Sequence, residues 1–429
     1  MAYLIYNLVL TIGVIVLSPV IAWRMITRKS ARAGVWQKLG AYPKKPCAGR
    51  TIWIHAVSVG ETLAVERLIR ELARRGRGSE LVLSVTTATG HAVAMEKLSD
   101  VASILYFPYD FIFSAQRAVR AINPALFVAV ETEIWPNVFR VVKESGGRVA
   151  LVNGRISDRS YPRYLRLKSL FRPVLQYVDM FLMQGDVDAE RVIEMGAEPE
   201  KVEKTGTLKY DNVVKGATRA ERENMRKSLG IGLDEKVIFL GNIHEGEEAA
   251  IRGAMRAGEK GGRCRIVVAP RRIENIEWIE NAARACGLKP VRKTTLRKNG
   301  VLPENAIPVI DTFGDLAMLY AIADVAFVGG SLIGHGGQNP LEPAAHAIAP
   351  LFGTFMSNFR DVSKELLNEG GAFEVAGEDD ICELICDLLA SGDKRLEAGR
   401  RALDVIERNR GVTIRVADRL LSALGEREE

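Results

Sequence analysis

Acidic side chains follow two of the apolar runs in the first half of this sequence. Glu61 ends the segment His55–Glu61, in which small residues lead out of a predicted strand and into a predicted helix. Glu131 and Glu133 follow the wholly apolar run Leu126–Val130. A carboxylate beside a buried strand is costly unless it has a partner or a task, and an ionised one suits general-base catalysis. For Glu61 the spacing gives equal weight to that role and to a plain acidic residue in the first turn of a helix.

Other polar residues follow the same predicted strands. Ser58 and Gly60 lie in the first loop, where the glycine permits a tight turn and close approach of a ligand. Arg155 follows the apolar run Val149–Val152, and a guanidinium at that position suits an acidic ligand. His55 is a candidate lining residue of the same site. We therefore expect these residues to be candidate substrate contacts.

The second half carries glycine-rich turns of the kind that hold phosphate groups. Gly329-Gly330-Ser331 follows the apolar run Val325–Val328. Glycines let backbone N–H groups approach a phosphate, and a helix that begins near Pro340 would add its positive end. Glu342 is then placed to accept hydrogen bonds from ribose hydroxyls. The further candidates for ligand contact in this half are His244, Glu245, Pro270, Arg271, Gly314, Asp315, Leu316, Ser331, Asn339 and Leu341.

Short apolar runs rich in β-branched residues alternate with longer helical stretches from residue 50 onward. This rhythm predicts a doubly wound parallel sheet in each half, and hence an α/β protein of two domains. Such sheets bind ligands at the carboxyl ends of their strands, so we expect a cleft between the domains. The predicted strands are Thr51–His55, Leu81–Thr86, Ile104–Phe107, Leu126–Val130, Val149–Val152, Met180–Met183, Val237–Leu240, Cys264–Ala269, Ala306–Ile310, Val325–Val328 and Pro350–Phe352.

Composition favours a globular protein with a modest positive charge. The 429 residues are 47% hydrophobic and 26% charged, with a formal net charge of +6. That excess fits an anionic lipid or a phosphorylated substrate, whereas no Lys/Arg block has the density of a nucleic-acid-binding arm. The scattered cysteines form no CxxC pair, which favours reduced thiols over disulfides or structural zinc; they are Cys47, Cys264, Cys286, Cys382 and Cys386.

Asp186 and Asp188 have the spacing by which some transferases hold a metal ion on a nucleotide. The pair also opens a predicted helix, Ala189–Met195, where acidic residues cap N–H groups, and we favour that role. The five histidines show neither HExxH nor any other paired-ligand spacing. We therefore expect neither a metal ion nor any other cofactor.

The amino-terminal segment has the composition of a membrane helix. No charged residue occurs from Tyr3 to Trp23, and about 21 residues at about 1.5 Å each would cross a bilayer core of about 30 Å. Arg24, Arg28 and Lys29 follow it, so the positive-inside rule places the rest of the chain in the cytoplasm. A cleaved signal peptide would need positive charge before the apolar run and a cleavage site after it. We therefore expect an anchor over residues 1–23 and a basic membrane-proximal segment over residues 24–50.

Eight motifs of the chain occur in the order that is typical of one enzyme family. They are HAVSVGE (55–61), ETEIWPN (131–137), NGRIS (153–157), GTLKYDN (206–212), HEGEE (244–248), VAPR (268–271), GDLAMLYAIADVAFVGGSL (314–332) and GGQNPLEPAAHA (336–347). In these motifs the chain resembles the bacterial Kdo transferases, the 3-deoxy-D-manno-octulosonic acid transferases of lipid A assembly. It departs from the family pattern at Ile243, where a hydroxyl residue is usual, and at Arg272, where histidine is frequent.

The resemblance implies a GT-B fold of two facing Rossmann-like domains, with an acceptor-binding domain over residues 51–211 and a donor-binding domain over residues 212–429. It implies inverting, metal-independent transfer of Kdo from CMP-Kdo to the lipid A precursor, lipid IVA, at the cytoplasmic face of the inner membrane. By this resemblance Glu61 is the catalytic base, and Glu131 and Lys209 support the transition state. The CMP-contacting residues that it implies are Pro270, Arg271, Gly314, Asp315, Leu316, Asn339, Pro340, Leu341 and Glu342.

Other functions remain open at the level of the sequence. A UDP-sugar transferase or epimerase would have the same two-domain design, and a membrane-tethered scaffold could bind nucleotide without turnover. The carboxylates at two strand ends speak against a scaffold. A dinucleotide-dependent oxidoreductase would need GxGxxG after the first strand, and HAVSVGE does not supply it.

Overall fold

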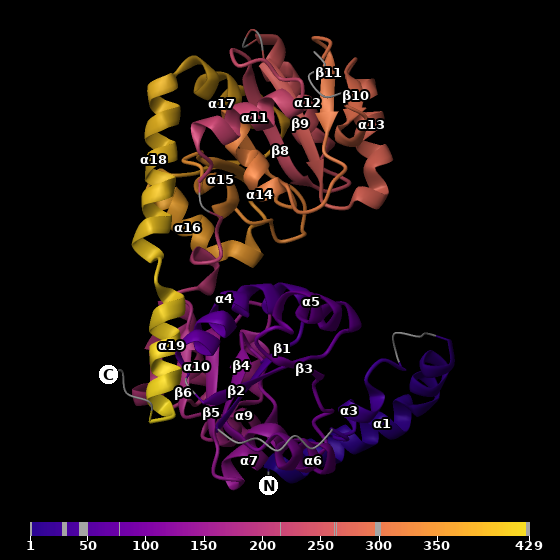
Figure 1. Ribbon diagram of the computed structural model, residues 1–429, viewed down its shortest axis with the longest axis vertical. Coiled ribbons are helices and arrows are strands. Elements are labelled where there is room, and N and C mark those ends of the chain that lie inside the picture. Colours follow the sequence, from indigo (N-terminus) through magenta and orange to yellow (C-terminus); the bar gives the residue numbers. More distant parts are fainter. Residues whose placement is uncertain are drawn as a thin grey trace. The chain divides into compact units, whose positions relative to one another are not determined.

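A computed structural model describes residues 2–27, 32–42, 50–76, 78–214, 216–260, 262, 264–296 and 302–425. The chain forms two compact units (Figure 1). Unit 1 comprises Met1–Asn212 and Gly411–Glu429, and unit 2 comprises Val213–Arg410. The division after Asn212 lies one residue beyond the expected boundary, but residues 411–429, which we expected in the second domain, belong to unit 1. Cys47 and part of the basic segment 24–50 lie outside the described residues.

Unit 1 is built on a parallel sheet of seven strands in the order β3-β2-β1-β4-β5-β6-β7. Its strands are β1 Arg50–Ala56, β2 Ser79–Val85, β3 Ser103–Tyr106, β4 Pro124–Val130, β5 Arg148–Gly154, β6 Met180–Met183 and β7 Val202–Lys204. Its helices are α1 Ala2–Thr27, α3 Val35–Lys38, α4 Val59–Arg75, α5 Ala88–Leu98, α6 Ile112–Ile122, α7 Pro136–Glu144, α8 Tyr161–Arg166, α9 Lys168–Leu175, α10 Asp186–Met195 and α19 Val412–Ala423, with the short 3₁₀ turn η2 Leu208–Tyr210.

The strand order places a topological switch point between β1 and β4. The chain runs outward from β1 through β2 to β3 and then returns to lay β4 on the other side of β1. The loops that follow β1 and β4 therefore leave the sheet in opposite directions, which opens a crevice at the carboxyl ends of these two strands. Glu61 follows β1 and Glu131 follows β4, so the fold brings both acidic segments to the crevice.

Helices cover both faces of this sheet, which explains why its strands read as continuous apolar runs. Along β1, Ile52 and Ile54 pack into the core on one face and Trp53 into the core on the other. His55 is fully buried beside Phe107, with ring centroids 3.5 Å apart, and its Nδ1 lies 3.0 Å from the carbonyl oxygen of Ser84. Burial lowers the pKa of His55 to about 3. His55 is therefore a neutral core residue, and our expectation that it lines a substrate site is wrong.

The last helix, α19, packs against α4 of unit 1 because a buried aspartate holds its first turn. Asp211 accepts hydrogen bonds from the backbone N–H groups of Gly411, at 2.7 Å, and Thr413, at 2.5 Å. A carboxylate at a helix amino terminus satisfies N–H groups that have no partner within the helix. Leu420 and Leu421 then complete the core beneath α4. The sequence does not reveal that α19 belongs to unit 1, because Asp211, which caps α19, lies 200 residues before Gly411.

Unit 2 is built on a second parallel sheet of seven strands, in the order β10-β11-β9-β8-β12-β13-β14. Its switch point lies between β8 and β12, so the loops after these strands share an edge. Its strands are β8 Lys236–Ile243, β9 Cys264–Pro270, β10 Lys289–Arg292, β11 Ala306–Val309, β12 Val325–Val328, β13 Pro350–Gly353 and β14 Phe373–Val375. Its helices are α11 Arg219–Ser228, α12 Glu248–Lys260, α13 Ile276–Ala285, α14 Leu316–Leu319, α15 Leu341–Ala344, α16 Arg360–Asn368, α17 Glu378–Ala390 and α18 Gly392–Asn409.

The amino-terminal helix α1 contains one stretch, Tyr3–Val20, that is long and apolar enough to cross a membrane. Its mean hydropathy is 2.0, and none of its residues is fully buried inside unit 1. By composition alone, this agrees with the expected anchor.

Candidate active site

Glu61 occupies the first turn of α4 at the switch point of unit 1. One oxygen of its carboxylate accepts a 2.6 Å hydrogen bond from the backbone N–H of Val57, and the other accepts a 3.1 Å hydrogen bond from the hydroxyl of Ser58. Ser58 in turn caps the helix by accepting from the N–H of Glu61. Glu61 is thus an acidic residue of the first helical turn, and the contacts of that turn also fix the position of its carboxylate. The two interpretations of Glu61, as a helix-start residue and as a general base, are therefore compatible. Burial raises the pKa of Glu61, and the charge of Glu131 raises it further.

Glu131 has a left-handed backbone with φ of 61°, which is rare for a residue with a side chain. Its N–H donates a 2.9 Å hydrogen bond to the carbonyl oxygen of Val152, so the end of β5 helps to hold this conformation. Such a strained backbone conformation is costly and occurs most often at active sites and ligand-binding positions. The half-buried Glu131 thus lies close enough to Glu61 for their charges to interact.

Glu133 is the third member of this group of carboxylates. Its pKa is raised to about 7, first by burial and then by the negative charges of Glu61 and Glu131. Like charges brought together in a partly buried site resist simultaneous ionisation, which is typical of acid–base sites. The sequence analysis assigns no catalytic role to Glu133, although its spacing of two residues from Glu131 is visible in the sequence.

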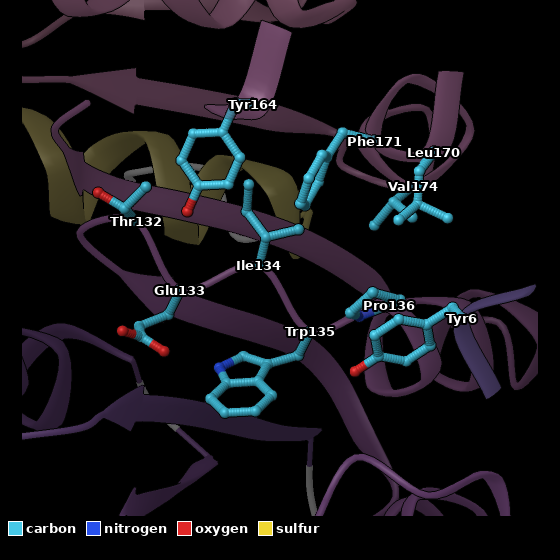
Figure 2. Close-up of a pocket in the computed structure, with 10 residues that line it drawn as sticks. All are labelled: Tyr6, Thr132, Glu133, Ile134, Trp135, Pro136, Tyr164, Leu170, Phe171 and Val174. Atoms are coloured by element: carbon cyan, nitrogen blue, oxygen red, sulfur yellow. The ribbon is translucent and has the colours of Figure 1, made fainter. Parts of the chain in front are cut away.

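A pocket of about 290 Å³ adjoins this group of carboxylates (Figure 2). At one end lie Glu133, Thr132 and the hydroxyl of Tyr164, and at the other the apolar side chains of α9 and the ring of Tyr6 from α1 (Figure 2). The pocket therefore grades from polar to apolar along its length, which suits an amphipathic ligand. It is lined by Tyr6, Thr132, Glu133, Ile134, Trp135, Pro136, Tyr164, Leu170, Phe171 and Val174.

The remaining predicted residues of unit 1 lie on neighbouring loops. The hydroxyl of Thr132 donates to the carbonyl oxygen of Arg155, which ties the loops after β4 and β5 together. Lys209 lies on η2, whose Leu208 N–H donates a 3.1 Å hydrogen bond to the side chain of Asn153 at the end of β5. Gly60 has no positive φ, and a Cβ atom there would meet only the Ser58 hydroxyl at 3.8 Å. The fold therefore does not require glycine at position 60 for a tight turn, contrary to our expectation.

In unit 2 the glycine-rich turn is organised by a residue that we did not single out, Glu247. This fully buried carboxylate accepts hydrogen bonds from the backbone N–H groups of Gly330, Ser331 and Leu332 at 2.7 to 3.0 Å, and from that of His244 at 2.9 Å. It therefore joins the loops after β8 and β12 across the switch point. Those N–H groups are not available to a phosphate, contrary to our expectation for this turn.

Ser331 also has a structural role. Its fully buried hydroxyl donates to the carbonyl oxygen of Val328 at 2.6 Å and accepts from the N–H of Gly353 at 2.8 Å. Its side chain links the ends of β12 and β13, so we no longer place it among the substrate contacts. The expected helix near Pro340 is α15, which is only four residues long and supplies little dipole.

Basic and polar side chains gather at the same edge of unit 2. The rings of His244 and His335 stack with centroids 4.7 Å apart, and Nε2 of His244 lies 3.2 Å from the amide nitrogen of Gln338. Burial lowers the pKa of His244, and the nearby charges of Arg271 and Arg272 contribute to that shift. Glu245 is exposed beside them.

Glu342 and Arg271 face one another closely enough to interact at this edge. Burial raises the pKa of Glu342 to about 7, while the charge of Arg271 and a hydrogen bond from Asn339 oppose that rise. One carboxylate oxygen of Glu342 is buried without a hydrogen-bond partner among the described residues. The guanidinium of Arg271 is exposed just after β9, where Pro270 ends the strand. A ligand with a hydroxyl group and a phosphate would satisfy both.

The predicted residues Gly314, Asp315 and Leu316 open α14 on a separate loop. Asp315 accepts hydrogen bonds from Lys293 and from the hydroxyl of Thr312, and the Lys293 ammonium lowers the pKa of Asp315. Its carboxylate is thus engaged with protein groups. Gly314 has a φ of 87°, and a Cβ atom there would meet nothing within 4 Å. The backbone conformation, and not crowding, is therefore what favours glycine at this position.

The Asp186 and Asp188 pair acts within unit 1. Asp186 forms a 2.7 Å ion pair with Lys204, and the buried Asp188 accepts a 2.7 Å hydrogen bond from the N–H of Ile156. Both residues lie in the first turn of α10, as we expected, but its N-cap residue is Gly185 and the contacts above join the two carboxylates to Lys204 and Ile156, so the capping role stays a prediction. Among the described residues no group of three or more His, Cys, Asp or Glu side chains is arranged to hold a metal ion.

Comparison with known proteins identifies the family. The model of the 3-deoxy-D-manno-octulosonic-acid transferase (kdotransferase) family matches residues 33–212. A 3-deoxy-D-manno-octulosonic acid transferase of Bordetella pertussis is 30% identical over 95% of this chain and 97% of its own length. The chain belongs to the Kdo transferase family. It is therefore a glycosyltransferase.

Two further similarities add to this result. A bifunctional glycosyltransferase/methyltransferase of Fusobacterium nucleatum is 37% identical over 78% of this chain, and this chain spans only 52% of the length of that relative. A solved glycosyltransferase structure from Rickettsia africae matches 89% of this chain and all of its own with a TM-score of 0.62 at 11% identity. This structural match, together with the two parallel sheets, confirms the α/β fold of GT-B type for this Kdo transferase family member.

Proposed function

We propose that this protein transfers Kdo from CMP-Kdo to a hydroxyl group of the lipid A precursor, lipid IVA, with inversion at the anomeric carbon. Glu61 accepts the proton of the acceptor hydroxyl as that oxygen forms a bond to the anomeric carbon of Kdo. The bond between that carbon and the phosphate oxygen breaks, and CMP leaves with the electron pair. General-base assistance of this kind is typically worth about 10²–10⁴ in rate.

The observation that carries the proposal is the position of Glu61 at the switch point of unit 1. It is half-buried and fixed by Val57 and Ser58, and the charge of the nearby Glu131 adds to its basicity. A base must be ionised at working pH yet basic enough to take a proton, and burial beside like charge produces that balance. The pocket next to it grades from polar to apolar, as an acceptor with sugar and acyl parts requires.

The edge of unit 2 supports binding of the nucleotide donor. The exposed Arg271 suits a phosphate or the Kdo carboxylate. The buried oxygen of Glu342, for which the described part of the chain offers no hydrogen-bond partner, suits a ribose hydroxyl. For Lys209 of unit 1 we propose, from the family resemblance, that its charge offsets negative charge that develops in the transition state. We propose that these cations replace the metal ion that many nucleotide-sugar transferases use.

We also propose that α1 holds the protein on the cytoplasmic face of the inner membrane. The apolar stretch Tyr3–Val20 and the basic residues after it support this location. Attachment raises the local concentration of the enzyme around a lipid acceptor.

The donor assignment can be tested by thermal unfolding of the purified protein in the presence of CMP or UDP at equal concentration. We expect CMP to raise the midpoint of unfolding and UDP to leave it nearly unchanged, because a bound ligand stabilises the native state by mass action. Stronger protection by UDP would contradict the CMP-Kdo assignment. The Arg271→Ala variant serves as the control, since it should lose the protection.

A further inference from the structure

The first turns of α1 are packed against unit 1 along one side of the helix. The half-buried residues recur at the helical spacing of three and four, and they are Tyr3, Tyr6, Asn7, Leu10 and Gly13. The intervening residues are exposed, with Leu4 at 76% and Val9 at 63%. The ring of Tyr3 lies edge-on to Tyr177, with centroids 5.7 Å apart. This half of α1 therefore belongs to the folded unit.

Polar contacts fix this docking. Asn7 and Asn137 exchange two side-chain hydrogen bonds, of 2.8 and 3.1 Å, and the hydroxyl of Tyr6 donates to Asp110 at 2.8 Å. Asn137 and Asp110 are buried, at 0% and 5% exposure, and Asp110 also accepts from the first N–H groups of α7. Paired amides and a buried carboxylate specify one register, because any slip leaves polar groups without partners.

Helix α3, which follows α1 in the chain, contacts the same loop of unit 1 as the start of α1. The N–H of Tyr109 donates a 2.7 Å hydrogen bond to the carbonyl oxygen of Lys38, at the end of α3, while the adjacent residue Asp110 accepts from Tyr6. The start of α1 and the segment beyond its end therefore contact neighbouring residues of one loop. A helix that crosses a bilayer separates its two ends by about 30 Å of hydrocarbon. The docked α1 cannot do this unless unit 1 enters the membrane.

Unit 1 cannot enter the membrane at this point. The helix α7, against which α1 docks, carries the exposed ion pair of Arg140 and Glu144, with nitrogen and oxygen 2.7 Å apart. Charged side chains in hydrocarbon are expensive. The other end of α1 carries Arg24, which is exposed, and a guanidinium at that end favours the depth of the headgroups over the hydrocarbon.

The exposed sides of α1 and its neighbours instead suit the surface of an anionic bilayer. Ile15 and Val16 are 66% and 69% exposed, and aromatic rings accompany them at Trp23, 59%, and Trp36, 76%. Tryptophan beside arginine and lysine is the usual composition of a segment at the membrane–water boundary. Helix α6 adds Phe113 and Arg117, whose guanidinium lies 5.9 Å from the ring centroid.

From these contacts we propose that α1 lies along the bilayer surface with both of its ends on the side of the catalytic units, and does not span the membrane. This revises the single crossing that the sequence predicts, and it rests on the membrane attachment under Proposed function. The acceptor pocket, whose wall includes Tyr6, then opens beside the helix that rests on the lipid.

The test uses the full chain with a biotin-acceptor peptide fused before Met1, expressed in cells with a biotin ligase confined to the cytoplasm. We expect the protein to sediment with membranes and the peptide to be biotinylated as fully as the same peptide fused after Glu429. A membrane-bound protein whose amino-terminal peptide stays unmodified would overturn the proposal, and a soluble protein would overturn the lipid-surface assignment. Neither readout involves sugar transfer, so failure of the catalytic proposal is distinguishable.

A matched pair of variants tests the docking contacts themselves. Asn7→Leu removes the amide pair with Asn137 and makes α1 more apolar, so we expect loss of amino-terminal biotinylation as the helix undocks and crosses. Thr11→Leu makes α1 more apolar in the same way. Thr11 is exposed and its hydroxyl donates to the carbonyl oxygen of Asn7 within α1, so biotinylation should persist. Equal biotinylation of both variants would show that the Asn7 pair does not hold α1 on the catalytic side.

Discussion

The carboxylate of Glu61 accepts a 2.6 Å hydrogen bond from the backbone N–H of Val57, at the point where β1 gives way to α4. The proposed base is therefore oriented by a backbone N–H group, which does not titrate. Burial and the charge of Glu131 raise the pKa of Glu61, while the hydrogen bonds from Val57 and Ser58 oppose that rise. The carboxylate is therefore more basic than an ordinary glutamate, which favours its acceptance of a proton.

Replacement of Glu61 should separate its two roles. Glutamine at N3 can retain a capping contact, so Glu61→Gln should keep the free energy of unfolding nearly constant and lower the transfer rate by about 10²–10⁴. Glu61→Ala should lower the rate similarly and also destabilise the protein by roughly 0.5–3 kcal/mol, because the hydrogen bonds from Val57 and Ser58 to the carboxylate are lost. Initial rates and chemical denaturation measure the two effects. A folded Glu61→Gln protein with near wild-type turnover would remove Glu61 as the base.

Glu133 should make the stability of the protein depend on pH. Its pKa is raised to about 7 in the folded state, so the unfolded chain loses this proton at lower pH than the folded protein does. The contribution of Glu133 is therefore most favourable below about pH 4.5, near the unfolded value, and declines as the pH rises toward about 7. Glu133→Gln should flatten this decline, as measured by thermal unfolding from pH 4.5 to 8.

Replacement of Glu131 should move the pH dependence of catalysis. The charge of Glu131 raises the pKa of Glu61, so Glu131→Gln should lower that pKa and shift the acidic limb of the kcat/KM profile to lower pH. Asp186→Asn, which removes a surface charge on α10, is the matched control and should leave the limb in place. An unchanged profile in Glu131→Gln would show that the charge of Glu131 does not act on Glu61.

Loss of Glu247 should unfold the donor edge of unit 2. Its carboxylate satisfies four backbone N–H groups, and each buried donor left without a partner costs about 1–3 kcal/mol. Glu247→Ala should therefore lower the free energy of unfolding by several kcal/mol and abolish protection by CMP. The exposed neighbour Glu245 provides a control, because Glu245→Ala should change stability little. Equal stability of the two variants would contradict the structural role of Glu247.

Arg271 should contribute more to donor affinity than its neighbour Arg272. The charge of Arg271 influences the buried Glu342, whereas the charge of Arg272 does not enter that balance. Loss of one charged contact to a phosphate or carboxylate typically costs about 1.5–3 kcal/mol. Titration calorimetry with CMP should show a larger loss of affinity for Arg271→Ala than for Arg272→Ala. The reverse order would mean that Arg272, where the family frequently has histidine, is the principal anion contact.

The predicted strands agree closely with the structure where both faces of a strand are buried. Met180–Met183 and Val325–Val328 match β6 and β12 residue for residue. The prediction missed β7, β10 and β14, which lie at or near sheet edges and carry charged residues such as Glu203, Lys289 and Glu374. A short strand with one exposed side has no continuous apolar run, so hydrophobicity alone does not reveal it.

The sequence predicted those residues of the candidate site that directly follow a strand. Glu61 and Glu131 follow strands that flank a switch point, and the apolar runs before them show this in the sequence. The role of Glu247 was not predictable, because three of its four backbone N–H partners come 83 to 85 residues later. The prediction that Ser331 contacts substrate failed for the same reason. Its hydroxyl is buried because it accepts a hydrogen bond from Gly353 at the end of β13, which is distant in the sequence.

The most direct measurement incubates the purified protein with CMP-Kdo, generated in place, and a tetraacylated lipid A precursor, and reads the products by mass spectrometry. We expect the lipid to gain the mass of at least one Kdo residue, with release of CMP, and the same gain in the presence of EDTA. Glu61→Gln run in parallel should give little product. An unmodified lipid with intact wild-type protein, or transfer only from a UDP-sugar, would contradict the proposed reaction.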